Sequence, residues 1–358
     1  MSNNQFKFTP TEVVLLLIIV VLINIRSLVP SNQTNNLEPL KEYIKSVNNN
    51  GDETVVLFSS GNMYDENNQL LYFRHKVVIS ILEKVLSESN ISLVTINTEC
   101  LGGEPECVKE FVEIAEAIAS INPKSILYIG IDSGIAVDKF ANIIAEEEIP
   151  IYTSGTEVEV KEKIYVGPDN EGLGRVAFEG LENEISSSDR VIYLETVEGD
   201  PAERGSTILD NGYPRINSVR TKLENIGVQT QNTLFTNWSR GTTYNVLKEE
   251  IKSNGVPDYI IAPSLETAEG AVEALRDLED EKNNIKTKIV VLDFSNIIKE
   301  MLKKEEIYAA VSQDLIGQAV FLASSVSENK NFPYSKELFV GKFITRETLA
   351  LEKVSTLW

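Results

Sequence analysis

With 358 residues, of which 42% are hydrophobic and 24% charged, the chain is long enough for one large domain or two ordinary ones, and its composition excludes wholesale disorder. The formal net charge of −21 argues against nucleic acid as a partner, because binding to phosphates needs a basic surface. One histidine and two cysteines leave almost nothing from which to build a His-based catalytic triad or a zinc site.

An unbroken run of Val, Leu and Ile fills residues 13–23. Its length suits a cleaved signal peptide, since a full bilayer span needs about 20 apolar residues. However, no small-residue cleavage site follows the run, and Arg26 can extend to the membrane interface, which lengthens the usable span to residues 8–29. We therefore interpret residues 1–30 as a retained single-pass anchor in the cell membrane, with cleavage as the alternative. Residues 31–53 are interpreted as a linker to an extracytoplasmic domain.

From residue 54 onward, apolar runs alternate with amphipathic segments, a pattern that predicts parallel sheets covered by helices on both faces. Strands are predicted at residues 54–60, 91–98, 125–130 and 150–154, with helices between them at 69–89, 107–121 and 135–148. His75 lies in the first helix, where a surface or packing role is expected. Cys100 and Cys107 precede or open the second helix, and their spacing permits a disulfide without requiring one.

The alternation restarts after residue 156. Strands are predicted at residues 163–168, 190–196, 228–236, 259–264, 288–293, 307–313 and 336–345, and helices at 170–186, 214–226, 239–253, 265–278, 295–304 and 315–328. The predicted fold class is therefore α/β, with two doubly wound parallel-sheet lobes joined by a hinge. The first lobe is predicted to comprise residues 54–155 and 314–333, and the second residues 156–313 and 334–348.

Ligands of such sheets bind outside the carboxyl ends of the strands, so a cleft between the lobes is expected to close on a small molecule. No G-x-G-x-x-G, P-loop or G-x-S-x-G motif follows any predicted strand. Nucleotide binding and nucleophilic catalysis therefore have little support. We expect a binding protein without enzymatic activity, cofactor or metal.

Five motifs follow one another between residues 131 and 320: IDSGIAVDKFANIIAEEEIPIYT, VGPDNEGLGRVAFEGL, FTNWSRGTTYNVLKEEI, IAPSLETAEGAVEALRDL and VVLDFSNIIKEMLKKEEIYAAVSQDLIGQAV. In this order they resemble the type I periplasmic sugar-binding proteins of the ribose- and xylose-binding class. The resemblance extends over residues 54–346. It implies two lobes that bind a small sugar.

The resemblance also implies roles for residues that lie near predicted strand ends. Asp293 and Gln313 match the Asp and Gln that hold sugar hydroxyls in the family. Arg220 matches the arginine of the family's cleft, and Trp238 matches the aromatic side chain that stacks on the sugar ring.

The sequence also departs from the family pattern. Ser264 replaces an expected asparagine, Gly155-Thr156 replaces an Asp-Arg pair, and an expected aromatic pair is reduced to Tyr64. Asp132 remains near a strand end. Two lost charged hydrogen bonds would lower affinity for the usual sugar by roughly three orders of magnitude, so the ligand differs, binding is weak or another group compensates. The predicted ligand-binding residues are Tyr64, Asp132, Arg220, Trp238, Ser264, Asp293 and Gln313.

Three functions are compatible with these features. We favour a membrane-tethered sensor of a small sugar, such as the pentoses xylose or ribose, that signals by cleft closure to a partner such as a sensor histidine kinase. The alternative is the substrate-binding subunit of a sugar ABC importer, with the permease as partner. An enzyme or scaffold on the same fold is the third. Its candidate carboxylate pair, Glu266 and Asp293, is better explained by a helix start and by hydroxyl binding.

Overall fold

The structure is a computed structural model that describes residues 53–60, 69–98, 100, 105–130, 135–154, 163–196, 212–282, 286–327 and 335–351. The chain divides into two compact units. Unit 1 comprises the described residues up to Gly167 together with Leu315–Glu337, and unit 2 comprises Pro168–Asp314 together with the described residues from Leu338. None of the helices in the described ranges is long and apolar enough to cross a membrane. The predicted anchor (residues 1–30) and nearly all of the predicted linker lie outside these ranges.

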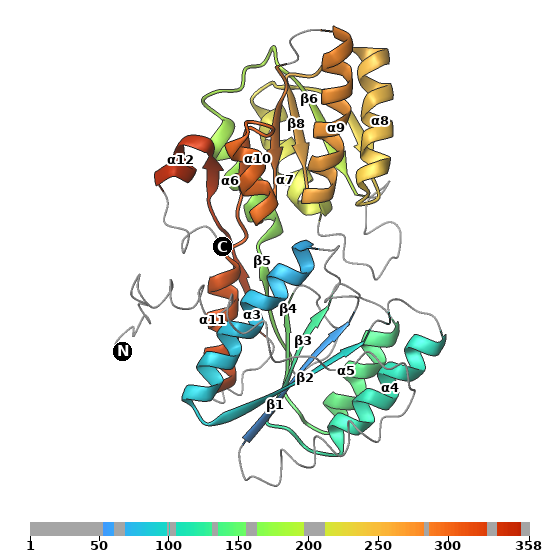
Figure 1. Ribbon diagram of the computed structural model, residues 1–358, viewed down its shortest axis with the longest axis vertical. Coiled ribbons are helices and arrows are strands. Elements are labelled where there is room, and N and C mark those ends of the chain that lie inside the picture. The colour runs from blue at the N-terminus through green and yellow to red at the C-terminus, as the bar shows by residue number, and fades with distance from the viewer. Residues whose placement is uncertain are drawn as a thin grey trace. The chain divides into compact units, whose positions relative to one another are not determined.

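Unit 1 is built on a six-stranded sheet in the order β11-β5-β4-β3-β1-β2. Its strands are β1 (Glu53–Ser60), β2 (Ile91–Thr98), β3 (Ser125–Gly130), β4 (Ile151–Ser154), β5 (Lys163–Pro168) and β11 (Ser335–Phe339). Its helices are α3 (Gln69–Glu88), α4 (Pro105–Ala119), α5 (Ile135–Glu146) and α11 (Leu315–Ser327). Pairing is parallel from β2 through β1, β3 and β4 to β5. Helix α4 packs beside α5, and α3 beside α11, on opposite faces of the sheet (Figure 1).

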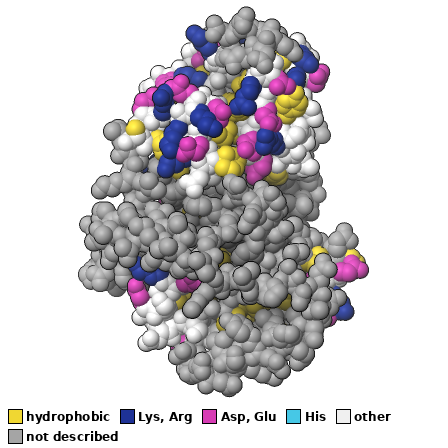
Figure 2. All heavy atoms as spheres, viewed as in Figure 1, with side chains coloured by type: hydrophobic (Ala, Val, Ile, Leu, Met, Phe, Trp, Pro, Cys, Tyr) yellow, Lys and Arg dark blue, Asp and Glu magenta, His cyan; other side chains and the backbone are white. Residues whose placement is uncertain are grey.

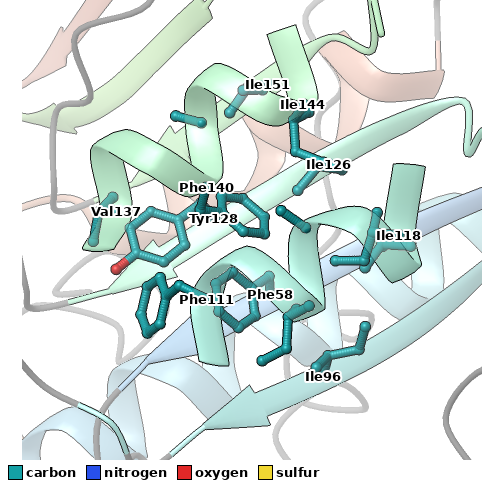
Figure 3. Close-up of a cluster of buried hydrophobic side chains, with 14 of the residues drawn as sticks. Phe58, Ile96, Phe111, Ile118, Ile126, Tyr128, Val137, Phe140, Ile144 and Ile151 are labelled. Carbon is teal, nitrogen blue, oxygen red and sulfur yellow. The ribbon is translucent and has the colours of Figure 1, made fainter. Parts of the chain in front are cut away.

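An aromatic cluster fastens α4 and α5 to the sheet of unit 1 (Figure 3). The ring of Phe58 on β1 lies 4.5 Å from Phe140 of α5, 5.1 Å from Phe111 of α4 and 5.6 Å from Tyr128 of β3, measured between centroids. All four side chains are buried. Aromatic rings at these separations attract one another beyond the gain from burial alone, so the cluster fixes both helices on this face.

Unit 2 is built on a second six-stranded sheet in the order β12-β10-β9-β8-β6-β7. Its strands are β6 (Arg190–Glu195), β7 (Gln229–Phe235), β8 (Tyr259–Ala262), β9 (Lys288–Val291), β10 (Ala309–Val311) and β12 (Phe343–Thr345). Its helices are α6 (Asn170–Leu181), α7 (Gly212–Asn225), α8 (Arg240–Asn254), α9 (Leu265–Lys282), α10 (Asn296–Lys303) and α12 (Arg346–Leu351). Strands β6 to β10 are parallel, whereas β12 runs antiparallel to β10. The prediction of α/β units with parallel sheets is thus confirmed for β1 to β5 and for β6 to β10.

Three helices of unit 2 begin at capping residues that the sequence places before each helical pattern. Asp169, Ser239 and Ser295 each accept a hydrogen bond from the backbone N–H three residues later, at 2.8, 3.2 and 3.1 Å. Such caps satisfy one of the orphan N–H groups of a helix start. They explain why these starts were predicted to within one residue.

The structure corrects the predicted boundary between the lobes. Strand β5 was assigned to the second lobe, but Ile151–Ser154 of β4 pairs with it, so it belongs to the sheet of unit 1. The single strand predicted at residues 336–345 is two strands, β11 in the first sheet and β12 in the second. Parallel pairing joins strands that are distant in sequence, so an alternating pattern does not reveal which sheet a strand enters.

Charges of both signs interleave on the face of unit 2 that Figure 2 shows. Here α8 and α9 are joined by ion pairs between Arg240 and Glu273 and between Lys248 and Asp277, the latter at 2.8 Å. Exposed pairs of this kind contribute little to stability, because solvent screens their charges. We interpret this face as solvated surface.

Close packing of α8 against α9 depends on Gly270. A Cβ atom at Gly270 would lie 2.4 Å from the carbonyl oxygen of Arg240. A Cβ atom at Gly241 would lie 4.0 Å from its nearest neighbour, the side-chain oxygen of Ser239. We therefore expect Gly270→Ala to lower the free energy of unfolding by about 1–3 kcal/mol, because the helices must move apart. Gly241→Ala is the matched control and should be neutral or stabilising by up to about 1 kcal/mol. Denaturation followed by circular dichroism measures both, and equal stabilities of the two variants would contradict the packing argument.

Candidate functional site

Three predicted residues gather at the carboxyl edge of the unit 2 sheet. Ala262 of β8 and Ala310 of β10 both pair with Val291 of β9, so these strands end side by side. Ser264, Asp293 and Gln313 follow the three strand ends in turn, and each is 3% exposed. Burying three polar side chains together is unfavourable unless they find hydrogen-bonding partners, which makes this edge a candidate site.

The two carboxylate oxygens of Asp293 differ in the hydrogen bonds that they accept. Its Oδ1 accepts hydrogen bonds from the backbone N–H of Phe294 at 2.8 Å and from Nε2 of Gln313 at 2.7 Å. Within the described residues, no donor reaches Oδ2. The carboxylate is therefore fixed in orientation and retains an acceptor for an external donor such as a hydroxyl group.

Arg215, which was not among the predicted site residues, lies at this same edge. Its side chain comes from the first turn of α7 and is 5% exposed. Its Nε donates to Oδ1 of Asn170 at 2.8 Å, and its Nη1 donates to the carbonyl oxygens of Pro263 and Leu292 at 3.0 and 3.2 Å. These carbonyls directly precede Ser264 and Asp293. Arg215 thus holds the ends of β8 and β9 in place beside the candidate site.

Arg220, one of the predicted ligand-binding residues, contacts residues of β6 and α7. Its Nη1 forms an ion pair with Oε1 of Glu195 at 2.5 Å, and its Nη2 donates to Oδ1 of Asn217 at 3.0 Å. Its guanidinium also lies 6.0 Å from the ring centroid of Tyr193. These partners belong to β6 and α7, not to β8 or β9. The structure thus places Arg220 at the end of β6, and its role in ligand binding stays a prediction, whereas Arg215 contacts the backbone next to Ser264 and Asp293.

The two arginines occupy different positions along α7. A helix that connects parallel strands runs back from the carboxyl edge, so its first turn lies nearest that edge. Arg215 is in the first turn, whereas Arg220 lies five residues later, roughly 7.5 Å further along the axis.

Trp238 lies in the turn between β7 and α8, with 36% of its surface exposed. Strands β8 and β6 separate β9 from β7, which places the turn roughly 14 Å from Asp293 at the usual strand spacing. Asn237 and Trp238 both have left-handed backbones, with φ of 50° and 56°. This unfavourable conformation is held by the N–H of Asn237, which donates to the carbonyl oxygen of Thr196 at 2.6 Å. Stacking of Trp238 on a ligand stays a prediction.

The predicted contributions of the first lobe cannot be placed, because Tyr64 and Asp132 lie outside the described residues, as do Gly155 and Thr156. Unit 1 does contain a disulfide, between Cys100 and Cys107, whose Cα atoms are 5.3 Å apart. It ties the segment after β2 to the first turn of α4. The structure thus forms the bond that the sequence spacing permitted.

A second carboxylate adjoins Asp293 at the carboxyl edge. Glu266 lies in the first turn of α9 and is only partly exposed. Burial is the main cause that raises the pKa of its carboxyl group. A hydrogen bond from the Glu266 backbone N–H lowers this pKa, the neighbouring Asp293 carboxylate raises it, and a hydrogen bond from the Ser264 side chain lowers it. No group of three or more metal-ligating side chains occurs in the described parts of the chain. The carboxylates of Glu266 and Asp293 make this edge acidic, and its polar side chains can form hydrogen bonds with a ligand.

Comparison with protein families gives one match, in which the periplasmic binding protein domain covers residues 82–328 of this chain. No curated protein matches the sequence.

Several solved structures share the fold. One is an ABC transporter periplasmic solute-binding protein from Actinobacillus succinogenes 130z with bound D-allose, with a TM-score of 0.65, 16% identity and coverage of 84% of this chain and 100% of that one. A periplasmic ribose ABC transporter protein from Conexibacter woesei DSM 14684 gives a TM-score of 0.67, 14% identity and coverage of 84% and 94%. A chain of the XylFII–LytSN complex gives 0.61, 15% identity and coverage of 83% and 98%.

Proposed function

The chain belongs to the type I periplasmic binding proteins, and from this we propose that it is an extracytoplasmic protein that binds a small sugar and catalyses no reaction. A pentose such as xylose or ribose is the ligand that we expect. The observation that supports this proposal most directly is the pair formed by Asp293 and Gln313 at the strand ends, in which Oδ2 of Asp293 meets no donor from the described residues.

The chemistry of this edge suits a polyhydroxylated ligand. Each sugar hydroxyl both donates and accepts, so it can donate to a fixed carboxylate while it accepts from a neighbouring amide. A hydrogen bond to a charged group contributes about 1.5–3 kcal/mol, and more than one is needed for micromolar affinity. Arg215 supports this chemistry because it fixes the backbone next to Ser264 and Asp293.

An extracytoplasmic location is supported by the disulfide between Cys100 and Cys107. Disulfides persist in oxidising compartments and are rare in the cytosol. We propose that residues 1–30 keep the protein in the cell membrane, with the binding domain outside.

For the physiological role, we propose a sugar sensor that signals to a membrane-bound partner such as a sensor histidine kinase. The apolar run at residues 13–23, which lacks a following cysteine for lipid attachment, supports a permanent tether. The alternative is the binding subunit of a sugar ABC importer, favoured by the similar structures described as ABC transporter proteins. Cross-linking in native membranes distinguishes the two by recovering either a histidine kinase or a permease.

Thermal unfolding in the presence of monosaccharides tests the binding proposal. A ligand at 100 times its dissociation constant stabilises the native state by about 2.7 kcal/mol. We therefore expect at least one pentose or hexose, at about 10 mM, to raise the melting temperature by about 2–4 °C. Mannitol, an open-chain polyol, is the control and should have no effect. A panel of pentoses and hexoses without any shift would reject the proposal.

A further inference from the structure

Glu266 shares the carboxyl edge with Asp293, although the sequence analysis explained it as a helix start and not as a ligand-binding residue. Ala262 of β8 pairs with Val291 of β9, and the same register continued by two residues brings Ser264 opposite Asp293. Glu266 follows Ser264 by two residues, in the first turn of α9, and is partly exposed. Glu266 is close enough to Asp293 for the two carboxylates to act on each other electrostatically, and the Ser264 side chain forms a hydrogen bond with Glu266.

The charged groups that act on Glu266 are acidic. Asp293, after β9, and Glu269, one turn along α9, both raise the pKa of the Glu266 carboxyl group, although burial is the larger cause. Glu269 is itself 3.6 Å from Arg240. The guanidinium of Arg215, which lies at the ends of β8 and β9, is directed to Asn170 and to two carbonyl oxygens. This edge therefore carries two neighbouring carboxylates, those of Asp293 and Glu266.

We propose that Glu266 is a specificity-determining residue, which together with Asp293 accepts hydrogen bonds from ligand hydroxyls and excludes sugars that carry an acidic group. This inference rests on the proposed sugar-binding function. A hydroxyl donates to either carboxylate, whereas a sugar acid or sugar phosphate brings a further negative charge into a partly buried acidic site. The repulsion of charges a few ångströms apart at a protein surface corresponds to an affinity loss of about 100-fold.

The test compares sugars that differ only by a carboxylate. D-xylose and D-glucuronate share the ring hydroxyl arrangement, as do L-arabinose and D-galacturonate, but each uronate carries a carboxylate on ring carbon 5. Isothermal titration calorimetry at pH 7.5 is expected to show that the wild-type protein binds the neutral sugar at least about 100-fold more tightly than its uronate.

Glu266→Gln keeps the size of the side chain and removes its charge, so it is expected to narrow this ratio by about tenfold or more. Glu269→Gln, on the same helix but paired with Arg240, is the matched control and should leave the ratio unchanged. A wild-type ratio near one, or a ratio that Glu266→Gln does not change, overturns the inference. Failure of all neutral sugars to bind instead rejects the proposed function.

The pH dependence gives an independent readout. Hydroxyl donation stabilises the ionised carboxylate, so a bound sugar lowers the raised pKa of Glu266. Affinity for the neutral sugar should therefore fall as the pH decreases through that raised pKa, and this fall should be smaller in Glu266→Gln. A purely structural Glu266 would leave the two pH profiles parallel, which would contradict the proposal.

Discussion

Asp293→Asn is expected to weaken sugar binding by about 100-fold while leaving the fold intact. The asparagine Oδ1 still accepts from the N–H of Phe294 and from Gln313. Its NH₂ group, however, replaces Oδ2, and this group donates where a ligand hydroxyl needs an acceptor. The variant loses a hydrogen bond to a charged group and instead sets two donors against each other. Together these changes weaken the free energy of sugar binding by about 2–3 kcal/mol.

Calorimetric titration with the sugar identified by thermal unfolding measures this effect. Asp258→Asn is the matched control, because Asp258 lies at the opposite end of the same sheet, where its Oδ2 accepts from the backbone N–H of Arg190 at 2.8 Å. The control should bind the sugar as the wild type does. If Asp293→Asn also bound normally, Asp293 would lie outside the site and the proposed function would lose its main support.

Arg220→Met is expected to lower the free energy of unfolding by about 3–5 kcal/mol, because it leaves the buried Glu195 carboxylate without its cation. The double variant Arg220→Met/Glu195→Leu should recover most of this loss, since it removes both charges and fills the space with apolar atoms. Chemical denaturation followed by circular dichroism provides the measurement.

The same variant separates a structural role of Arg220 from the ligand-binding role that the sequence predicted. At low temperature, where the variant is still folded, its affinity for the sugar should stay within a few-fold of the wild type. Normal stability combined with lost binding would instead support the ligand-binding role that the resemblance implies for Arg220.

Most of the fold could be predicted from the sequence because its signals are local. Fully buried strands such as β3 read as continuous apolar runs, and the caps Ser239 and Ser295 mark the starts of α8 and α10. The register of a parallel sheet then places Asp293 and Gln313 together, because each ends a strand.

Features that depend on non-local contacts were not predicted. Whether β5 pairs with β4 or opens a new sheet is decided by packing between distant segments, not by the residues of β5. The two arginines of α7 are chemically identical, and only the direction of the helix distinguishes Arg215 from Arg220. Glu266 was recognised at a helix start, but its proximity to Asp293 follows from the pairing of β8 with β9.

The separation of β11 from β12 affects how the protein is made. Each unit draws an edge strand from the segment between Ser335 and Thr345, so neither sheet is complete until this late part of the chain has left the ribosome. A nascent chain that lacks it exposes the open flanks of β5 and β10. Neither sheet can therefore complete its edge before residues 335–345 have been synthesised, however early its other strands emerge.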